Sequence, residues 1–148
     1  MLRIRVREVM SSPAVCIDSL SDIPSAHLLM LDTGVRRLPV VDDGELVGII
    51  TLGDVRGASP SEVSSLNRSE LDYLTHQIKV QRIMSRDVVT VTPDTSLAEA
   101  AQLMIERRIS GLPVVSEAGR VVGMITESDI FRTLIEVLQM ATAAEPVL

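Results

Sequence analysis

Residues 38–54 of the chain read LPVVDDGELVGIITLGD, and residues 112–129 read LPVVSEAGRVVGMITESD. Both stretches contain an LPVV run, a glycine followed by an apolar run, and a Thr with an Asp three residues later. The second stretch is one residue longer, in the polar turn between its apolar runs, where an insertion disturbs packing least. The chain is therefore predicted to contain an internal duplication.

The similarity between the two copies extends on both sides of these stretches. A shift of 74 residues aligns Val6 with Val80 and Met10-Ser11 with Met84-Ser85. Beyond the turn the shift is 75 residues. We expect residues 1–58 to form the first repeat, 59–79 a helical linker and 80–148 the second repeat. The linker prediction rests on a capping-box pattern with Pro at the first helical position in residues 59–62.

Each repeat predicts the element order β-α-β-β-α. The first strand is a short β-branched run, the first helix has apolar residues at helical spacing, and the next two strands flank a glycine-containing turn. One repeat alone is too small to bury a comfortable core, so we expect an α/β fold (α+β type) of two pseudo-symmetric repeats packed sheet to sheet. The expected strands are 15–17, 38–41 and 46–50, then 88–91, 112–115 and 121–125, and the last helix runs from about Ser128 to Met140.

The composition excludes several function classes. The 148 residues are 46% hydrophobic with a mean hydropathy of +0.30, which is too apolar for a disordered chain. A net charge of -6 argues against nucleic acid as the main partner, and Tyr73 and Phe131 are the only aromatic residues that could stack on bases. No apolar run approaches the ~18 residues of a membrane helix, and the charged start does not resemble a signal peptide. A cytoplasmic protein is expected.

The chain contains no motif for catalysis or metal binding. It has no Gly-rich phosphate loop, nucleophile elbow or zinc-protease motif. Its single cysteine, Cys16, lies in an apolar run typical of a small buried hydrophobe, and His27 and His76 have no counterparts in the other repeat. We therefore expect no enzyme activity, no metal site and no required cofactor.

Thr51 and Asp54, matched by Thr126 and Asp129, are the polar residues that the duplication retains after a strand. Two interpretations are open for this Thr-x-x-Asp pattern. The Thr and Asp can cap the following helix reciprocally. Alternatively, the helix start can attract phosphate while the carboxylate accepts hydrogen bonds from ribose hydroxyls.

The repeats resemble cystathionine-β-synthase (CBS) domains, through the Met-Ser, Leu-Pro-Val-Val and Gly-x-Ile-Thr-x-x-Asp motifs quoted above. Two copies resemble a tandem CBS pair, or Bateman module. The linker resembles that of AcuB-type stand-alone CBS proteins. Longer proteins of this type have an extra C-terminal domain, which we expect this chain to lack. The resemblance implies a regulatory module that binds adenosine-containing ligands (AMP, ADP, ATP or S-adenosylmethionine) and acts on a separate, unidentified protein.

The resemblance also implies two composite ligand sites. Site A combines Thr51 and Asp54 with Ser85, Thr90, Ile109 and Ser110. Site B combines Thr126 and Asp129 with Ser11, Cys16, Arg36 and Arg37. Because arginine matches phosphate oxygens, site B is expected to prefer nucleotide phosphates, provided that Glu127 points to solvent. A solvated corner is the competing interpretation of Arg36 and Arg37.

Family pairs commonly form homodimers through their helices, and a ligand-free dimerisation or assembly module is the alternative function. An enzyme that uses Thr, Asp and Arg alone is a third hypothesis, which an ATP hydrolysis assay would test.

Overall fold

The computed structural model describes residues 3–58 and 68–144, which form two compact units. Unit 1 contains residues 3–13, 89–118 and 122–144, and unit 2 contains residues 14–58, 68–88 and 119–121. The units do not follow the boundaries of the sequence repeats. Residues 59–67 of the predicted helical linker (59–79) lie outside the described residues, and helix α3 (Arg68–Gln77) forms most of the remainder.

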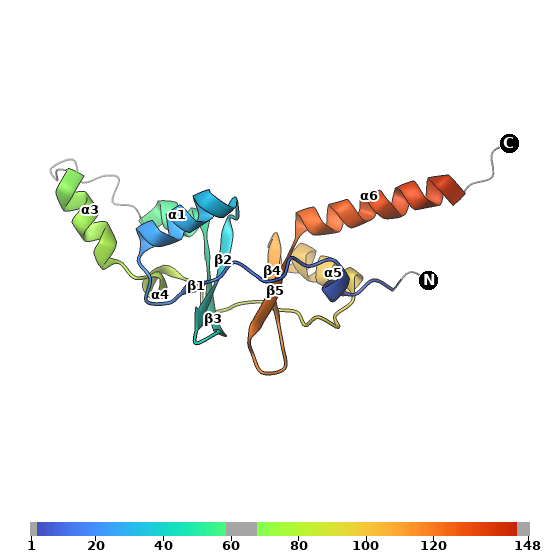
Figure 1. Cartoon of the computed structure of the whole chain (residues 1–148), viewed down its shortest axis with the longest axis horizontal. Coiled ribbons are helices and arrows are strands. Elements are labelled where there is room, and N and C mark those ends of the chain that lie inside the picture. The colour runs from blue at the N-terminus through green and yellow to red at the C-terminus, as the bar shows by residue number, and fades with distance from the viewer. Residues whose placement is uncertain (1–2, 59–67, 145–148) are drawn as a thin grey trace. The chain divides into compact units, whose positions relative to one another are not determined.

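Unit 2 is built on a three-stranded sheet in the order β1-β2-β3 (Figure 1). β1 (Ile17–Asp18) runs parallel to β2 (Arg37–Asp42), which pairs antiparallel with β3 (Glu45–Thr51). The β2–β3 turn needs left-handed backbone at two positions, and Asp43 (φ 49°) and Gly44 (φ 82°) supply it. Helices α1 (Ile23–Thr33), α2 (Leu52–Ala58) and α4 (Val80–Ile83), together with α3, complete the unit.

Capping fixes the ends of α1. Asp22 accepts a hydrogen bond from the Ser25 backbone N–H at 2.8 Å. Hydrogen bonding with the Ser25 side chain, and to a smaller extent with its backbone, lowers the pKa of the Asp22 carboxyl. Pro24 lies in the first turn, where its missing N–H costs nothing. Gly34 ends the helix with a φ of 76°. The helix then buries Ile23 and Met30 among the core side chains of the sheet.

Unit 1 repeats this arrangement with a shorter sheet. β4 (Gly111–Val115) and β5 (Val121–Thr126) form a two-stranded sheet, and Val91 adds a single parallel bridge to Val114. The helices are a short 3-10 turn η1 (Val6–Glu8), α5 (Leu97–Arg107) and α6 (Glu127–Ala144). Each unit has its own apolar core.

The first residues of each sequence repeat pack in the unit that holds the sheet of the other repeat. In unit 2, Ser85 exchanges two backbone hydrogen bonds of 2.9 Å with Ile49 of β3. In unit 1, Ser11 pairs in the same way with Met124 of β5, at 2.9 and 3.0 Å. Val80 and Val6, which precede these bridges, are fully buried in the two cores. Each core therefore contains side chains from both repeats.

Two glycines allow this close pairing. A Cβ at Gly48 would lie 2.5 Å from the Met84 sulfur and 2.9 Å from the Ser85 carbonyl oxygen. A Cβ at Gly123 would lie 2.6 Å from the Met10 sulfur and 2.9 Å from the Ser11 carbonyl oxygen. Both contacts are too short for any side chain, so the two strands need glycine at these positions.

The structure confirms the predicted mixed α/β fold and both hairpins. The first strands are shorter than expected: β1 pairs only at Ile17–Asp18, and in 88–91 only Val91 reaches the neighbouring strand. The last helix is longer than expected, because it begins directly after Thr126 and the alanine-rich residues that follow Met140 continue it to Ala144.

We expect Gly48→Ala and Gly123→Ala to lower the free energy of unfolding by about 1–3 kcal/mol each, because the new methyl group overlaps a backbone carbonyl oxygen. Urea denaturation monitored by circular dichroism measures this loss. Gly57→Ala is the matched control: no atom lies within 4 Å of its Cβ position in α2, so this variant should be as stable as the parent or slightly more stable. Unchanged stability of both Gly48→Ala and Gly123→Ala would contradict the packing argument.

Candidate functional site

Thr51 and Asp54 form a reciprocal cap where β3 meets α2. The Asp54 Oδ2 accepts a hydrogen bond from the Thr51 backbone N–H at 2.9 Å, and the Thr51 hydroxyl oxygen accepts one from the Asp54 backbone N–H at 3.1 Å. Both residues are half-buried. The capping interpretation of the Thr-x-x-Asp pattern is confirmed here. The cap holds the carboxylate at a fixed place beside the helix start, with one oxygen directed into the turn.

Thr126 and Asp129 form the equivalent turn where β5 meets α6. The Asp129 Oδ2 accepts from the Thr126 backbone N–H at 2.9 Å and from the Thr126 hydroxyl at 3.2 Å. The other oxygen, Oδ1, accepts from Nη1 of Arg132 at 3.0 Å. The Asp129 side chain is only 8% exposed, whereas that of Arg132 is 70% exposed. Glu127, whose carboxylate could repel a phosphate, is exposed.

Arg36 and Ser110 occupy matching places next to these two turns. The Leu52 N–H donates to the Arg36 carbonyl oxygen at 2.8 Å, and the Glu127 N–H donates to the Ser110 carbonyl oxygen at 2.9 Å. Arg37 lies opposite Thr51 in the β2–β3 ladder. Within unit 2 the backbone of Arg36 and Arg37 is therefore adjacent to the Thr51–Asp54 turn.

The remaining predicted site residues lie on the segments that join the elements. Ser85 and Ser11 are the exposed residues of the backbone bridges to β3 and β5. Cys16 is half-buried just before β1, and burial raises the pKa of its thiol, so it does not form a reactive thiolate readily. Thr90 and Ile109 are half-buried in unit 1.

The predicted sites each draw residues from both units. In site A, Thr51, Asp54 and Ser85 belong to unit 2, and the other members to unit 1. In site B, Ser11, Thr126 and Asp129 belong to unit 1, and the other members to unit 2. Each unit thus brings together one Thr-x-x-Asp turn and one serine bridge. The combination across units stays a prediction.

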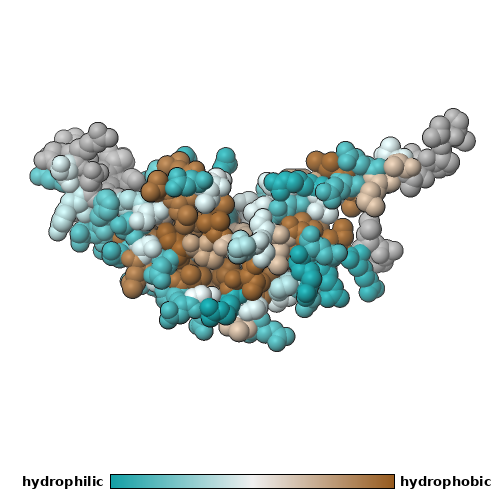
Figure 2. Space-filling view, in the orientation of Figure 1, coloured by the Kyte–Doolittle hydropathy of each residue, from teal (hydrophilic) through white to brown (hydrophobic). Residues whose placement is uncertain are grey.

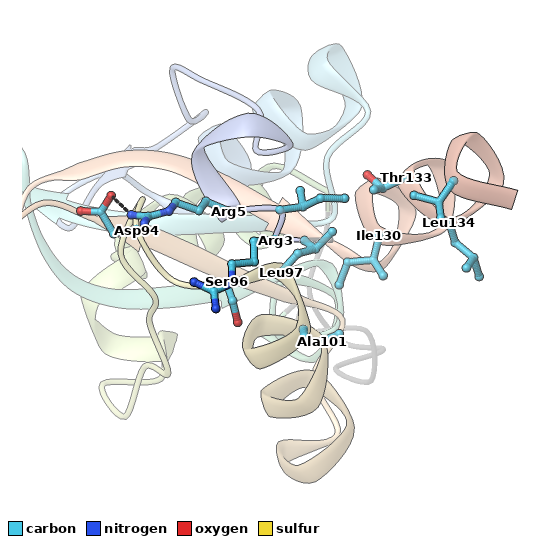
Figure 3. A pocket seen from close by; sticks show the side chains of 12 residues that line it. Arg3, Arg5, Asp94, Ser96, Leu97, Ala101, Ile130, Thr133 and Leu134 are labelled. Carbon is cyan, nitrogen blue, oxygen red and sulfur yellow. Dashed lines mark hydrogen bonds and ion pairs between the residues drawn. The ribbon is translucent and has the colours of Figure 1, made fainter. Parts of the chain in front are cut away.

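An apolar groove of about 570 Å³ lies in unit 1 between α5, α6 and the segment before η1. Figure 3 shows Leu97 of α5 and Ile130 of α6 facing each other in this groove, with the Arg5–Asp94 ion pair (3.1 Å) at its edge. Large apolar side chains next to the groove are exposed on α6, including Phe131 (61%) and Leu134 (47%). Figure 2 shows apolar side chains at the surface of α6 among hydrophilic ones.

The residues described by the structure contain no cluster of metal-ligating side chains. Within the same residues, no helix has both the length and the apolar character needed to cross a membrane.

Sequence reasoning missed two features of these sites. The glycines of the two hairpins align between the repeats, but only the structure shows that they make room for the Met-Ser segments. Arg132 aligns with Gly57, so no identity between the repeats points to it.

Comparison with known proteins identifies the family. The CBS domain model matches residues 6–61 and 80–136, which is more than half of the chain. A CBS domain-containing protein of Dictyostelium discoideum is 35% identical over 139 residues, covering 93% of this chain and 96% of that protein.

Two solved structures share the fold over most of the chain. A protein from Vibrio cholerae assigned as an acetoin utilization protein (AcuB) has a TM-score of 0.80 and 29% identity, and the match covers 98% of this chain and 100% of that one. The CBS domain pair of protein MJ0100, solved with 5′-methylthioadenosine and S-adenosyl-L-methionine, has a TM-score of 0.74 and 32% identity, over 90% of this chain and 97% of that one.

Other relatives are much longer. The homoserine O-acetyltransferase of Methanosphaera stadtmanae is 35% identical over 85% of this chain, but the match covers 23% of that protein. Its enzyme name therefore describes a larger protein in which the matched region is one part. The two matched segments, together with the near full-length match to the Dictyostelium protein, show that this chain belongs to the CBS domain family and carries two CBS domains.

Proposed function

We propose that the chain is a sensor module that binds adenosine-containing ligands and regulates a separate protein. The observation that carries this proposal is the pair of Thr-x-x-Asp turns, each holding a carboxylate at a strand-to-helix junction. The 32% identity to the MJ0100 pair, which was solved with two adenosine derivatives, supports the ligand class.

The chemistry of the turns fits a ribose. A carboxylate can accept hydrogen bonds from two neighbouring ribose hydroxyls, and charge-assisted bonds of this kind contribute about 1.5–3 kcal/mol each. In the Thr51–Asp54 turn the cap uses Oδ2, and the other carboxylate oxygen is left for a ligand. Capping and ligand binding are compatible, because the cap orients the carboxylate before the ligand arrives.

The two ligand sites are proposed as site A and site B, with the residues given above. Site B, which includes Arg36 and Arg37, is proposed to prefer nucleotides with phosphate groups, and the exposure of Glu127 meets the condition set for this preference. Site A is proposed to take adenosine or S-adenosylmethionine, or to stay empty. AMP, ADP and ATP are the candidate nucleotides.

The regulated partner acts in trans in this proposal, and the module needs no resident cofactor. A cytoplasmic location and the absence of catalysis also remain proposals. We expect no ATP hydrolysis in the presence of Mg²⁺, because the sequence has no Gly-rich phosphate loop and burial raises the pKa of the Cys16 thiol.

We expect at least one of AMP, ADP, ATP, S-adenosylmethionine and 5′-methylthioadenosine to raise the melting temperature, because a ligand that binds only the folded state stabilises it by RT ln(1 + [L]/Kd). Asp54→Ala should remove the part of the melting-temperature shift that comes from ligand at site A, and Asp129→Ala the part that comes from site B. A thermal-shift panel on the three proteins measures this. Asp54→Asn and Asp129→Asn are the controls for stability, because asparagine keeps an oxygen that can accept the backbone N–H. Flat curves for all five ligands would contradict the proposal.

We expect Arg36→Gln to weaken ADP binding about tenfold at site B while leaving adenosine binding unchanged, because the guanidinium would contact phosphate alone. Calorimetric titration in the Asp54→Ala background isolates the Asp129-containing site. The same substitution in the Asp129→Ala background should have no effect. Loss of ADP affinity only in the Asp129→Ala background would contradict site B. It would assign Arg36 to the Thr51–Asp54 turn, which its backbone adjoins.

An assembly function is the second candidate, and the apolar groove of unit 1 favours it. We infer that the groove and the exposed stripe of α6 pack against a second copy of the chain. Phe131, Leu134, Ile135 and Leu138 recur at helical spacing and are all exposed, so the same face can be buried symmetrically in a homodimer.

We expect Leu134→Glu to shift the protein from dimer to monomer, since a charge would be buried at the centre of the apolar stripe. Sedimentation velocity over a range of protein concentrations measures the change. Ala143→Glu adds the same charge to an exposed position on another face of α6 and should leave the dimer intact. A parent protein that is monomeric at every concentration would contradict the assembly candidate.

A further inference from the structure

The two Thr-x-x-Asp turns differ in what the second carboxylate oxygen does. Asp129 Oδ1 accepts a hydrogen bond from the Arg132 guanidinium at 3.0 Å, in an ion pair one helical turn along α6. Asp54 forms no ion pair among the described residues. The residue three positions after it, which corresponds to Arg132, is Gly57. The repeats therefore carry one carboxylate with both oxygens engaged and one with an oxygen available.

Arg132 is placed to move without disturbing the fold. Its side chain is 70% exposed, so the guanidinium keeps most of its contact with water whether or not it touches Asp129. The ion pair joins an exposed guanidinium to a buried carboxylate, so a ligand can displace Arg132 only if its hydroxyls take over the hydrogen bond to Oδ1. The Thr126 bonds to Oδ2 would stay in place during that displacement.

The surroundings of Arg132 offer alternative partners for a displaced guanidinium. A polar pocket of about 350 Å³ in unit 1 is lined by Asp129, Arg132, Glu8 and Glu136, with Ile4, Val9 and Thr133. Glu136 lies four residues after Arg132 on α6, the spacing at which oppositely charged side chains meet on a helix. The guanidinium thus has space to turn and a second carboxylate within the same pocket.

We propose that Arg132 competes with the ligand ribose for the Asp129 carboxylate, and so lowers the affinity of the Asp129 site for uncharged adenosine derivatives. This inference rests on the proposed function, since it assumes that the Thr-x-x-Asp carboxylates hold ribose. It makes Arg132 a residue that determines specificity: uncharged nucleosides bind the Asp54 site in preference, because Gly57, at the position of Arg132, has no side chain to pair with that carboxylate.

The test uses the full-length chain and titration calorimetry with 5′-methylthioadenosine, which carries no phosphate. The Asp54→Ala background isolates the Asp129 site, and there Arg132→Gln is expected to raise the affinity about fivefold. The Asp129→Ala background isolates the Asp54 site, and there Gly57→Arg is expected to lower the affinity by a similar factor. No atom lies within 4 Å of the Cβ position of Gly57, and the residue is exposed, so the Cβ of the new arginine meets no neighbour.

Two controls separate competition from a general effect of charge. Arg56→Gln in the Asp129→Ala background removes an exposed arginine two residues from Asp54 and should leave the affinity unchanged. Raising the salt concentration from about 0.05 M to about 0.5 M should raise the affinity of the Asp129 site for the uncharged ligand, because salt screens the exposed Arg132 guanidinium and weakens its attraction to Asp129. Arg132→Gln should remove this salt dependence.

The outcomes distinguish the two proposals. Binding that is abolished in the Asp54→Ala/Asp129→Ala double variant but is unaffected by Arg132→Gln and Gly57→Arg would overturn the role of Arg132 and leave the sensor function intact. Binding that persists in the double variant, or no binding of any adenosine derivative to any variant, would contradict the sensor function and the competition together. Opposite changes in the two single-site backgrounds support both.

Discussion

The backbone of each hairpin approaches a segment from the other repeat so closely that only glycine fits between them. At Gly48 and Gly123 the missing side chain lets a Met-Ser segment exchange two hydrogen bonds with the strand. The valines ahead of these segments, Val80 and Val6, are then fully buried. Neither sequence repeat can complete its apolar core from its own residues. The pairing therefore couples the folding of the two repeats, although each CBS domain is a separate unit in the sequence.

The same hairpins end in the turns that carry the candidate function. Thr51 and Thr126 close their strands and start a helix, and the aspartates three residues later complete the caps. A cap of this kind contributes about 1 kcal/mol to stability, so it would justify the residues without any ligand. The second carboxylate oxygen adds something that stability does not require, which is an oriented acceptor at a helix start. The structural and binding interpretations thus describe one geometry.

Much of the fold follows from local sequence. The β-branched runs and the Asp43-Gly44 turn specify the hairpins, and Asp22 and Ser96 specify helix starts through their side chains. The exchange of the Met-Ser segments could not be predicted, because a self-alignment shows which residues correspond but not on which copy they pack. The same limit applies to the sites: Thr51 and Asp54 are recognisable as a pair, whereas the partners of Arg36 depend on packing over long sequence distances.

The differences between the repeats are as informative as the identities. Around the two turns, Gly57 corresponds to Arg132, and the Arg36-Arg37 corner corresponds to Ser110-Gly111. Each difference changes charge near a carboxylate whose position the caps keep the same. In the proposed function, a duplicated scaffold with matching caps distinguishes ligands by charge at the two sites without any change in backbone. Since the exposed arginines contribute little to the cores, their replacement alters recognition at a low cost in stability.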